Sequence, residues 1–340
     1  MHQQMERLFK VEWTAQELLK RFEKSGPLIE PIINITPYNA SDEEFISKPT
    51  NYLIIQGSFD PPTTSHIEIL SKAISFRLNM DPSEAIKVMF LLSLSHVDKK
   101  LNVLNRSLLG NRVEMLKDLL PSLKLKLPII IGLSNVARYI DLIKAINHSF
   151  NDLKDIFFIM GMDVFKKLLD PIYYSKSLEE VLILIFKADY IVAGREEVFT
   201  KEEFDSYLIN HLPTKYHKKV HFLSLPESYR FLNATSIRER YFRNQPVENK
   251  YIHSTIRKYL ENNNIYNSTS KWIATKIAIQ TVVQLTLEAD LDQIIAIKIL
   301  RNLIHDIQDN ASLQKQLIDD YRTEKNTEIS KRWEKLLTLI

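Results

Sequence analysis

The chain has 340 residues, of which 45% are apolar and 26% are charged, and its formal net charge is +3. This length allows two domains or one domain with extensions, and the composition is that of a globular protein with a proper core. The small net charge disfavours a protein that coats nucleic acid, and the absence of cysteine excludes disulfides, Cys-zinc sites and cysteine nucleophiles.

The sequence gives no indication of a membrane or secretory protein. No apolar run approaches the ~20 residues that a transmembrane helix needs. Residues 1–6 lack the basic-then-apolar pattern of a signal peptide. We therefore expect a cytoplasmic protein that has neither a membrane nor a nucleic acid as its partner.

Residues 1–50 form the first predicted segment. Apolar residues recur at helical spacing over residues 1–25 and predict a helix. Residues 26–50 contain four prolines and predict an extended connector.

Residues 51–266 alternate strand-like apolar runs with helical segments. This alternation predicts an α/β fold, a doubly wound, Rossmann-like and mostly parallel sheet with helices on both faces. The predicted strands are residues 52–55, 88–94, 127–131, 156–160, 190–193 and 220–223. The predicted helices are residues 66–79, 107–120, 136–149, 162–169, 177–187, 235–243 and 252–262.

Residues 267–340 have a different composition, with no glycine and no proline. Apolar residues recur there at helical spacing and predict a C-terminal helical region of three or four helices. These helices would pack on the nucleotide domain or form the contact of a homo-oligomer.

The junction after the first strand of the predicted domain carries the most informative motif. It reads QGSFDPPTTSH from Gln56 to His66 and joins a predicted strand to a predicted helix. Gly57 allows a tight turn and close approach of a ligand, and Pro61 and Pro62 stiffen the chain before the helix. Phosphate binds well at a helix N-terminus because free N–H groups and the helix dipole both point at it. The motif therefore predicts a nucleotide phosphate site.

A second strand-to-helix junction reads LNATSIR, from Leu232 to Arg238. Asn233 or Thr235 can cap the helix that follows. Arg238, one turn later, suits a phosphate because its guanidinium donates two parallel hydrogen bonds and stays charged.

Together the two junctions resemble the two signatures of the nucleotidyltransferase superfamily with H/T-x-x-H and I-S-x-T-x-I-R motifs. Within it, residues 51–266 resemble the nicotinamide/nicotinate mononucleotide adenylyltransferases, with Thr63 at the first His position and Asn233 in place of Ser. The resemblance implies that His66 and Arg238 are catalytic. It implies an ATP site made of Gly57, Ser58, Phe59, Thr63, His66, Asn233, Thr235, Ser236 and Arg238.

The resemblance also implies a mononucleotide site, made of Lys99, Lys100, Gly161, Asp163, Tyr174 and Arg195. Tyr174 stands where animal-type members place a Trp near the pyridine nucleotide. Arg138 and Asp141 occupy a segment that often carries an aromatic residue and a Thr near the pyridine ring. These departures concern the pyridine pocket more than the ATP pocket.

The implied reaction joins ATP to nicotinamide or nicotinate mononucleotide and releases pyrophosphate, giving NAD or its deamido form. Mg²⁺ would enter with ATP as the cofactor, because no carboxylate cluster suggests a metal cage on the protein. Two alternatives stay open. One keeps the fold with another acceptor, of the pantetheine phosphate or cytidylyl type, and the other is a non-catalytic nucleotide sensor.

Overall fold

The computed structural model describes residues 24–35, 49–94, 109–174, 177–194, 200–242, 245–263 and 265–266, together with residues 10, 11, 14, 15, 17, 18 and 21. The predictions for residues 267–340, for Lys99 and Lys100 and for Arg195 lie outside the described residues. Among the described residues, no helix has the length and apolar character required to cross a membrane.

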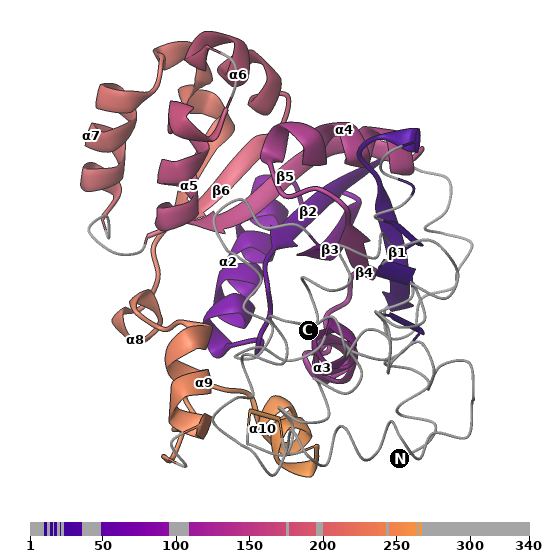
Figure 1. The fold of residues 1–340 in the computed structure, drawn as a ribbon. Coiled ribbons are helices and arrows are strands. Elements are labelled where there is room, and N and C mark those ends of the chain that lie inside the picture. Colours follow the sequence, from indigo (N-terminus) through magenta and orange to yellow (C-terminus); the bar gives the residue numbers. More distant parts are fainter. Residues whose placement is uncertain are drawn as a thin grey trace, which may run out of the picture.

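The described residues form a seven-stranded sheet in the order β1-β4-β3-β2-β5-β6-β7 (Figure 1). The strands are β1 (Ile29–Ile35), β2 (Thr50–Gln56), β3 (Ile86–Ser93), β4 (Ile129–Ser134), β5 (Leu153–Gly161), β6 (Asp189–Ala193) and β7 (Val220–Leu223). Strands β2 to β7 are mutually parallel, and β1 pairs antiparallel with β4. The parallel strands therefore have the order 3-2-1-4-5-6 of a Rossmann fold, with the switch point between β2 and β5.

Helices cover both faces of the sheet, as the alternation of apolar runs predicted. One face packs against α4 (Tyr139–Ser149), α5 (Met162–Leu168), α6 (Leu178–Ile185) and α7 (Lys201–His211). The other face packs against α2 (Thr64–Met80), α3 (Leu109–Ser122) and the N-terminal segment, whose described residues between 10 and 25 are helical. Successive residues of β2 serve opposite faces, since Tyr52 and Ile54 join the first core and Leu53 and Ile55 the second.

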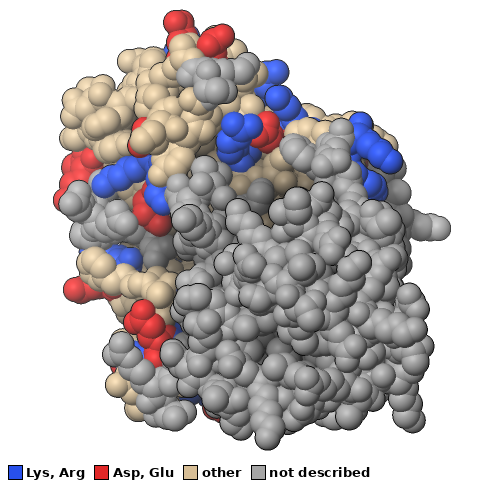
Figure 2. All heavy atoms as spheres, in the orientation of Figure 1, with Lys and Arg blue, Asp and Glu red and all other residues tan. Residues whose placement is uncertain are grey.

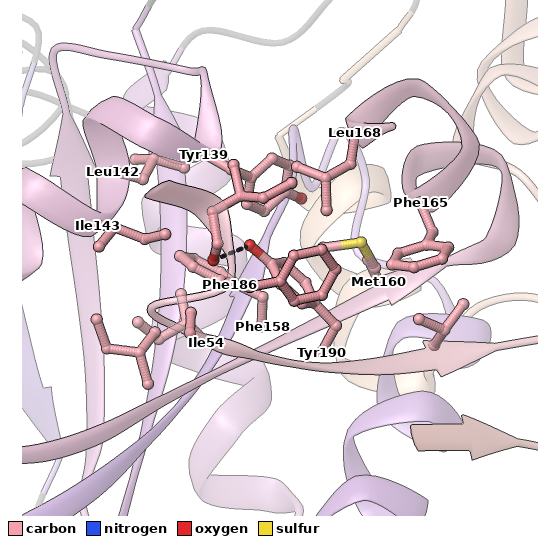
Figure 3. Close-up of a cluster of buried hydrophobic side chains, with 14 of the residues drawn as sticks. Ile54, Tyr139, Leu142, Ile143, Phe158, Met160, Phe165, Leu168, Phe186 and Tyr190 are labelled. Carbon is pink, nitrogen blue, oxygen red and sulfur yellow. Dashed lines mark hydrogen bonds between the residues drawn. The ribbon is translucent and has the colours of Figure 1, made fainter. Parts of the chain in front are cut away.

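The core under α4, α5 and α6 is rich in aromatic side chains (Figure 3). Phe158 and Tyr190 lie in adjacent strands with their rings stacked, and Tyr139 meets the Phe158 ring edge-on. The Tyr190 hydroxyl donates to the carbonyl oxygen of Ile185 at 2.7 Å, so burial leaves no unsatisfied donor there. This core holds the beginnings of α4 and α5 against the carboxyl ends of the strands.

Three further helices follow β7 and complete the chain up to residue 266. They are α8 (Glu227–Arg230), α9 (Ala234–Phe242) and α10 (Ser254–Asn262). Helix α8 lies beside α2, and α10 lies beside α3 (Figure 1). A separate apolar cluster joins α3, α9 and α10 and includes Met115, Ile237 and Ile256. These contacts place the second signature, at the start of α9, close to the first signature, at the start of α2.

The predicted strands and helices are confirmed with boundaries that shift by a few residues. The connector predicted for residues 26–50 contains an edge strand, β1, that the pattern did not identify. Gly132 lies inside β4 rather than after it, and a Cβ there would meet Ile29 of β1 at 3.3 Å. Helices α7 and α8 were also not predicted.

Candidate active site

The first signature forms the turn from β2 into α2, at the carboxyl end of the central strand. Thr63 is the N-cap of α2, and its side chain accepts a hydrogen bond from the backbone N–H of His66. The Thr63 backbone N–H donates in return to Nδ1 of His66 at 3.0 Å. A backbone N–H can only donate, so Nδ1 is the acceptor and the neutral ring carries its proton on Nε2. The capping box thus fixes the orientation and the tautomer of His66.

Phe59 supports this turn from below, although the sequence motif placed it among the ATP-binding residues. The whole residue is only 1% exposed, and its ring packs against the rings of Phe90 and His66. A Cβ at Gly57 would meet the Phe59 ring at 3.1 Å. Phe59 is therefore a packing residue of the turn, and a side chain at position 57 would press on its ring.

The second signature meets the first at Asp60. Arg238 donates from Nη1 to the backbone carbonyl oxygen of Asp60, and the same nitrogen lies 3.8 Å from the Asp60 carboxylate. Nη2 of Arg238 donates to the Thr235 hydroxyl at 3.1 Å. The Asp60 carboxylate also accepts from the Tyr266 hydroxyl at 2.6 Å. Segments about two hundred residues apart in the chain therefore converge on one buried aspartate.

Helix α9 begins beside this contact. Asn233 accepts a hydrogen bond from the backbone N–H of Ser236 at 2.9 Å, so it is Asn233 that caps the helix. The Ser236 hydroxyl donates to the Asn233 carbonyl oxygen, also at 2.9 Å. Asn233 and Thr235 are exposed, and Ser236 is half-buried. These side chains are accessible beside the α2 turn.

Arg112 of α3 also reaches this turn. Its Nη1 lies 3.5 Å from the Ser58 hydroxyl. Arg112 was not among the predicted site residues. It adds a second guanidinium on the same side of the turn as Ser58.

Gln56 opens the first motif but was not among the predicted site residues. From the end of β2 its amide donates to the Ser93 hydroxyl at 2.7 Å and to the Ala137 carbonyl oxygen at 3.1 Å. The signal available in the sequence was its place directly before Gly57. Its contacts join the carboxyl ends of β2, β3 and β4 next to the signature turn.

The other half of the site lies at the end of β5, across the switch point. Gly161 is the N-cap of α5, and Asp163 lies in the first turn of that helix. Oδ1 of Asp163 is buried and has no hydrogen-bond partner among the described residues. A buried carboxylate oxygen without a donor is costly, so this atom is a candidate acceptor for a ligand hydroxyl or N–H group.

Tyr174 lies close to this group but is not a freely exposed platform. It is half-buried, and its hydroxyl donates to the Leu168 carbonyl oxygen at 3.1 Å. Burial raises the pKa of Tyr174 to about 12, an effect opposed by the charge of Arg138 and reinforced by that of Asp141. Burial likewise raises the pKa of Tyr139, with smaller contributions from Tyr174 and Asp163. These residues form one neighbourhood at the beginnings of α4 and α5.

No group of three or more His, Asp or Glu side chains able to hold a metal ion occurs within the described part of the chain. The donors near the signature turn are hydroxyls, imidazole and guanidinium groups, which suit phosphate rather than a bare cation.

The fold is a Rossmann-type α/β fold, and the two signatures meet at the carboxyl edge of its sheet, beside the switch point between β2 and β5. No protein-family model matches the chain, and no curated protein does so. Among solved structures, Plasmodium falciparum nicotinic acid mononucleotide adenylyltransferase complexed with APC is similar. It is 18% identical, and the match covers 64% of this chain and 97% of that chain with a TM-score of 0.46. The same enzyme complexed with NaAD gives the same values. At this level of similarity we draw no functional conclusion from the overlays and rely on the side chains of this chain.

Proposed function

We propose that this chain is a nucleotidyltransferase that joins the adenylyl group of ATP to a pyridine mononucleotide and releases pyrophosphate. The observation that carries the proposal is the contact of Arg238 with Asp60. This contact brings the helix start, a histidine whose Nδ1 accepts a backbone hydrogen bond, and a guanidinium together at the switch point of a Rossmann sheet, where ligands of such sheets bind. A helix start of this kind is suited to a phosphate group.

In the proposed reaction, a 5′-phosphate oxygen of the mononucleotide attacks the α-phosphorus of ATP. A new P–O bond forms, the bond from the α-phosphorus to the bridging oxygen breaks, and pyrophosphate leaves with the electron pair. The phosphate is already a competent nucleophile, so no covalent enzyme intermediate is required. Catalysis then depends on positioning and on stabilising the charge around the α-phosphorus.

Each part of the site has a role in this scheme. The start of α2 and the Nε2–H donor of His66 stabilise the transferring group, and Arg238 with Thr235 holds the ATP phosphates. The buried carboxylate oxygen of Asp163 accepts a hydrogen bond from a hydroxyl group of the bound nucleotide. Mg²⁺, which we expect on the ATP phosphates, would neutralise part of their charge.

The test measures pyrophosphate release from Mg·ATP with nicotinamide mononucleotide and with nicotinate mononucleotide. We expect turnover with at least one acceptor. His66→Ala should lower kcat by about 10²–10³-fold, because it removes a preorganised donor at the developing charge. Circular dichroism would verify that the variant is folded.

The control variant is His148→Ala. His148 is exposed near the end of α4, remote from the signature turn, and its removal should leave turnover unchanged. Near-wild-type turnover of His66→Ala would remove His66 from the mechanism. A protein that binds ATP and yet turns over neither acceptor would contradict the pyridine assignment and favour another acceptor or a sensor.

A further inference from the structure

A preorganised guanidinium lies at the start of α4, on the side of the site away from Arg238. Arg138, the N-cap residue of this helix, donates from Nε to Oδ2 of Asp141 at 2.9 Å, and its Nη2 lies 2.8 Å from the same oxygen. The Asp141 side chain is 14% exposed and that of Arg138 is 48% exposed. Asp141 thus holds the Nε–Nη2 edge of the guanidinium. No acceptor for Nη1 occurs among the described residues.

A hydrogen bond of the neighbouring residue places Arg138 beside the signature turn, and the charge of Arg138 acts on Tyr174. The carbonyl oxygen of its neighbour Ala137 accepts from Gln56, the residue that leads into the signature turn. On the other side is Tyr174, which is close enough for the charges of Arg138 and Asp141 to act on its hydroxyl. Arg138 therefore lies between the signature turn and the neighbourhood of Asp163 and Tyr174. Figure 2 shows Lys and Arg side chains on the upper part of the molecule, over the region where α4 and α6 lie in Figure 1.

We propose that Arg138 selects an acceptor mononucleotide whose base carries a carboxylate, so that nicotinate mononucleotide is preferred over nicotinamide mononucleotide. The inference rests on the proposed function. The acceptor's phosphate must lie at the reaction centre near His66 and the start of α2, so a cation on the α4 side meets the other end of that acceptor. A carboxylate accepts charge-assisted hydrogen bonds from Nη1 and Nη2, whereas a carboxamide is neutral and its NH₂ group cannot accept.

Asp141 acts as the positioning residue in this arrangement. Its carboxylate holds the Nε side of Arg138 and lies 3.9 Å from the ammonium group of Lys144. Lys144 is 60% exposed and lines a separate cavity of about 520 Å³ near the amino end of β5, between α4 and α6. Lys144 is therefore a matched control, since it is a second cation next to Asp141 that faces away from the site.

The experiment measures kcat/KM for both mononucleotides with saturating Mg·ATP, in the wild type, Arg138→Gln, Arg138→Lys and Lys144→Gln. We expect the wild type to prefer nicotinate mononucleotide by at least about tenfold. Arg138→Gln should lower kcat/KM for this acceptor by about 10–100-fold and change the value for nicotinamide mononucleotide by less than about threefold. Arg138→Lys should retain part of the preference, and Lys144→Gln should retain all of it.

Two results would overturn the inference while leaving the proposed function intact. An equal fall for both acceptors in Arg138→Gln would show that Arg138 contacts the phosphate that they share. An unchanged ratio would show that Arg138 does not meet the base. If the wild type turned over neither acceptor, the proposed function would fail. The dissociation constants of both mononucleotides would then be measured by calorimetry for the wild type and for Arg138→Gln. A preference for nicotinate mononucleotide that the variant loses would support the inference, and an unchanged preference or no binding would overturn it.

Discussion

Asp60 is the residue on which the architecture of the site depends most directly. It is fully buried, and its carboxylate is met by the Tyr266 hydroxyl and the Arg238 guanidinium. A buried carboxylate is tolerated only where donors and a counter-charge compensate for its lost hydration. Asp60 thus joins the first signature to two segments near the end of the domain, which contain Arg238 and Tyr266.

Replacing Tyr266 with Phe removes the donor at 2.6 Å from Asp60 and adds no bulk. We expect the free energy of unfolding to fall by about 1–3 kcal/mol, because a buried acceptor loses its hydrogen bond. Urea denaturation of the full chain would measure it. In a double-mutant cycle with Asp60→Asn, the two residues should couple by at least about 0.5 kcal/mol. Additive effects would show that this contact does not contribute to stability.

At the scale of elements, a second polar junction stabilises the opposite end of the sheet. Asp152, just before β5, accepts from the Tyr52 hydroxyl of β2 at 2.8 Å and pairs with Lys87 of β3. Its backbone carbonyl oxygen accepts from the Thr50 N–H at 2.7 Å. Burial alone would raise the pKa of Asp152, but the hydrogen bonds from Lys87 and Tyr52 outweigh it and lower the pKa.

This shift has a defined sign in stability. Because the folded pKa lies below the unfolded one, the contribution of Asp152 is complete above about pH 4 and is lost as the pH falls through the folded pKa. Asp152→Asn should therefore lower the free energy of unfolding at pH 7 by about 1–3 kcal/mol. The difference from the wild type should shrink towards pH 2–3 in urea titrations. Asp155→Asn, at an exposed carboxyl three residues further on in β5, should show neither effect.

The elements that the sequence predicted are those with a simple hydrophobic pattern. Strands β2 to β6 are nearly continuous buried runs, which is the pattern of parallel strands covered on both faces. Strand β1 lacks that pattern because it is a half-exposed edge strand that contains Pro31 and a register shift. Helix α7 buries only Phe204 and Leu208. Its apolar residues are therefore too few, among many charged ones, to show a clear helical periodicity. Its capping box, Thr200 with Glu203, was the usable signal.

The site was predictable in its parts but not in its assembly. The turn residues, the N-cap role of Asn233 and the nearness of Asp163 to the switch point follow from local rules. The burial of Phe59, the link from Gln56 to Ala137 and the convergence on Asp60 depend on tertiary packing. No local pattern states which distant backbone atom a guanidinium will reach.

At the scale of the whole molecule, one buried side chain adds three hydrogen bonds to the apolar packing between the N-terminal segment and the sheet. Asn135, which follows β4, donates to the carbonyl oxygens of Leu18 and Gly26 and accepts from the Leu28 N–H at 2.9 Å. Three residues further on is Arg138. Asn135 therefore holds the segment before β1 next to the beginning of α4. A shift of this segment would be expected to move the part of the site that contains Arg138.

The contact of Arg238 and Tyr266 with Asp60 affects the order in which the sheet and the site form during synthesis and are lost during unfolding. Every strand of the sheet is complete by Leu223, yet the site gains Arg238 and the Tyr266 contact only after more chain has emerged from the ribosome. Helices α9 and α10 share a small cluster with α3, apart from the two main cores, so we expect them to detach first among the described elements. Under rising urea, activity should disappear before the circular-dichroism signal of the sheet does. Coincident loss of both signals would show that the helices and the sheet unfold as one unit.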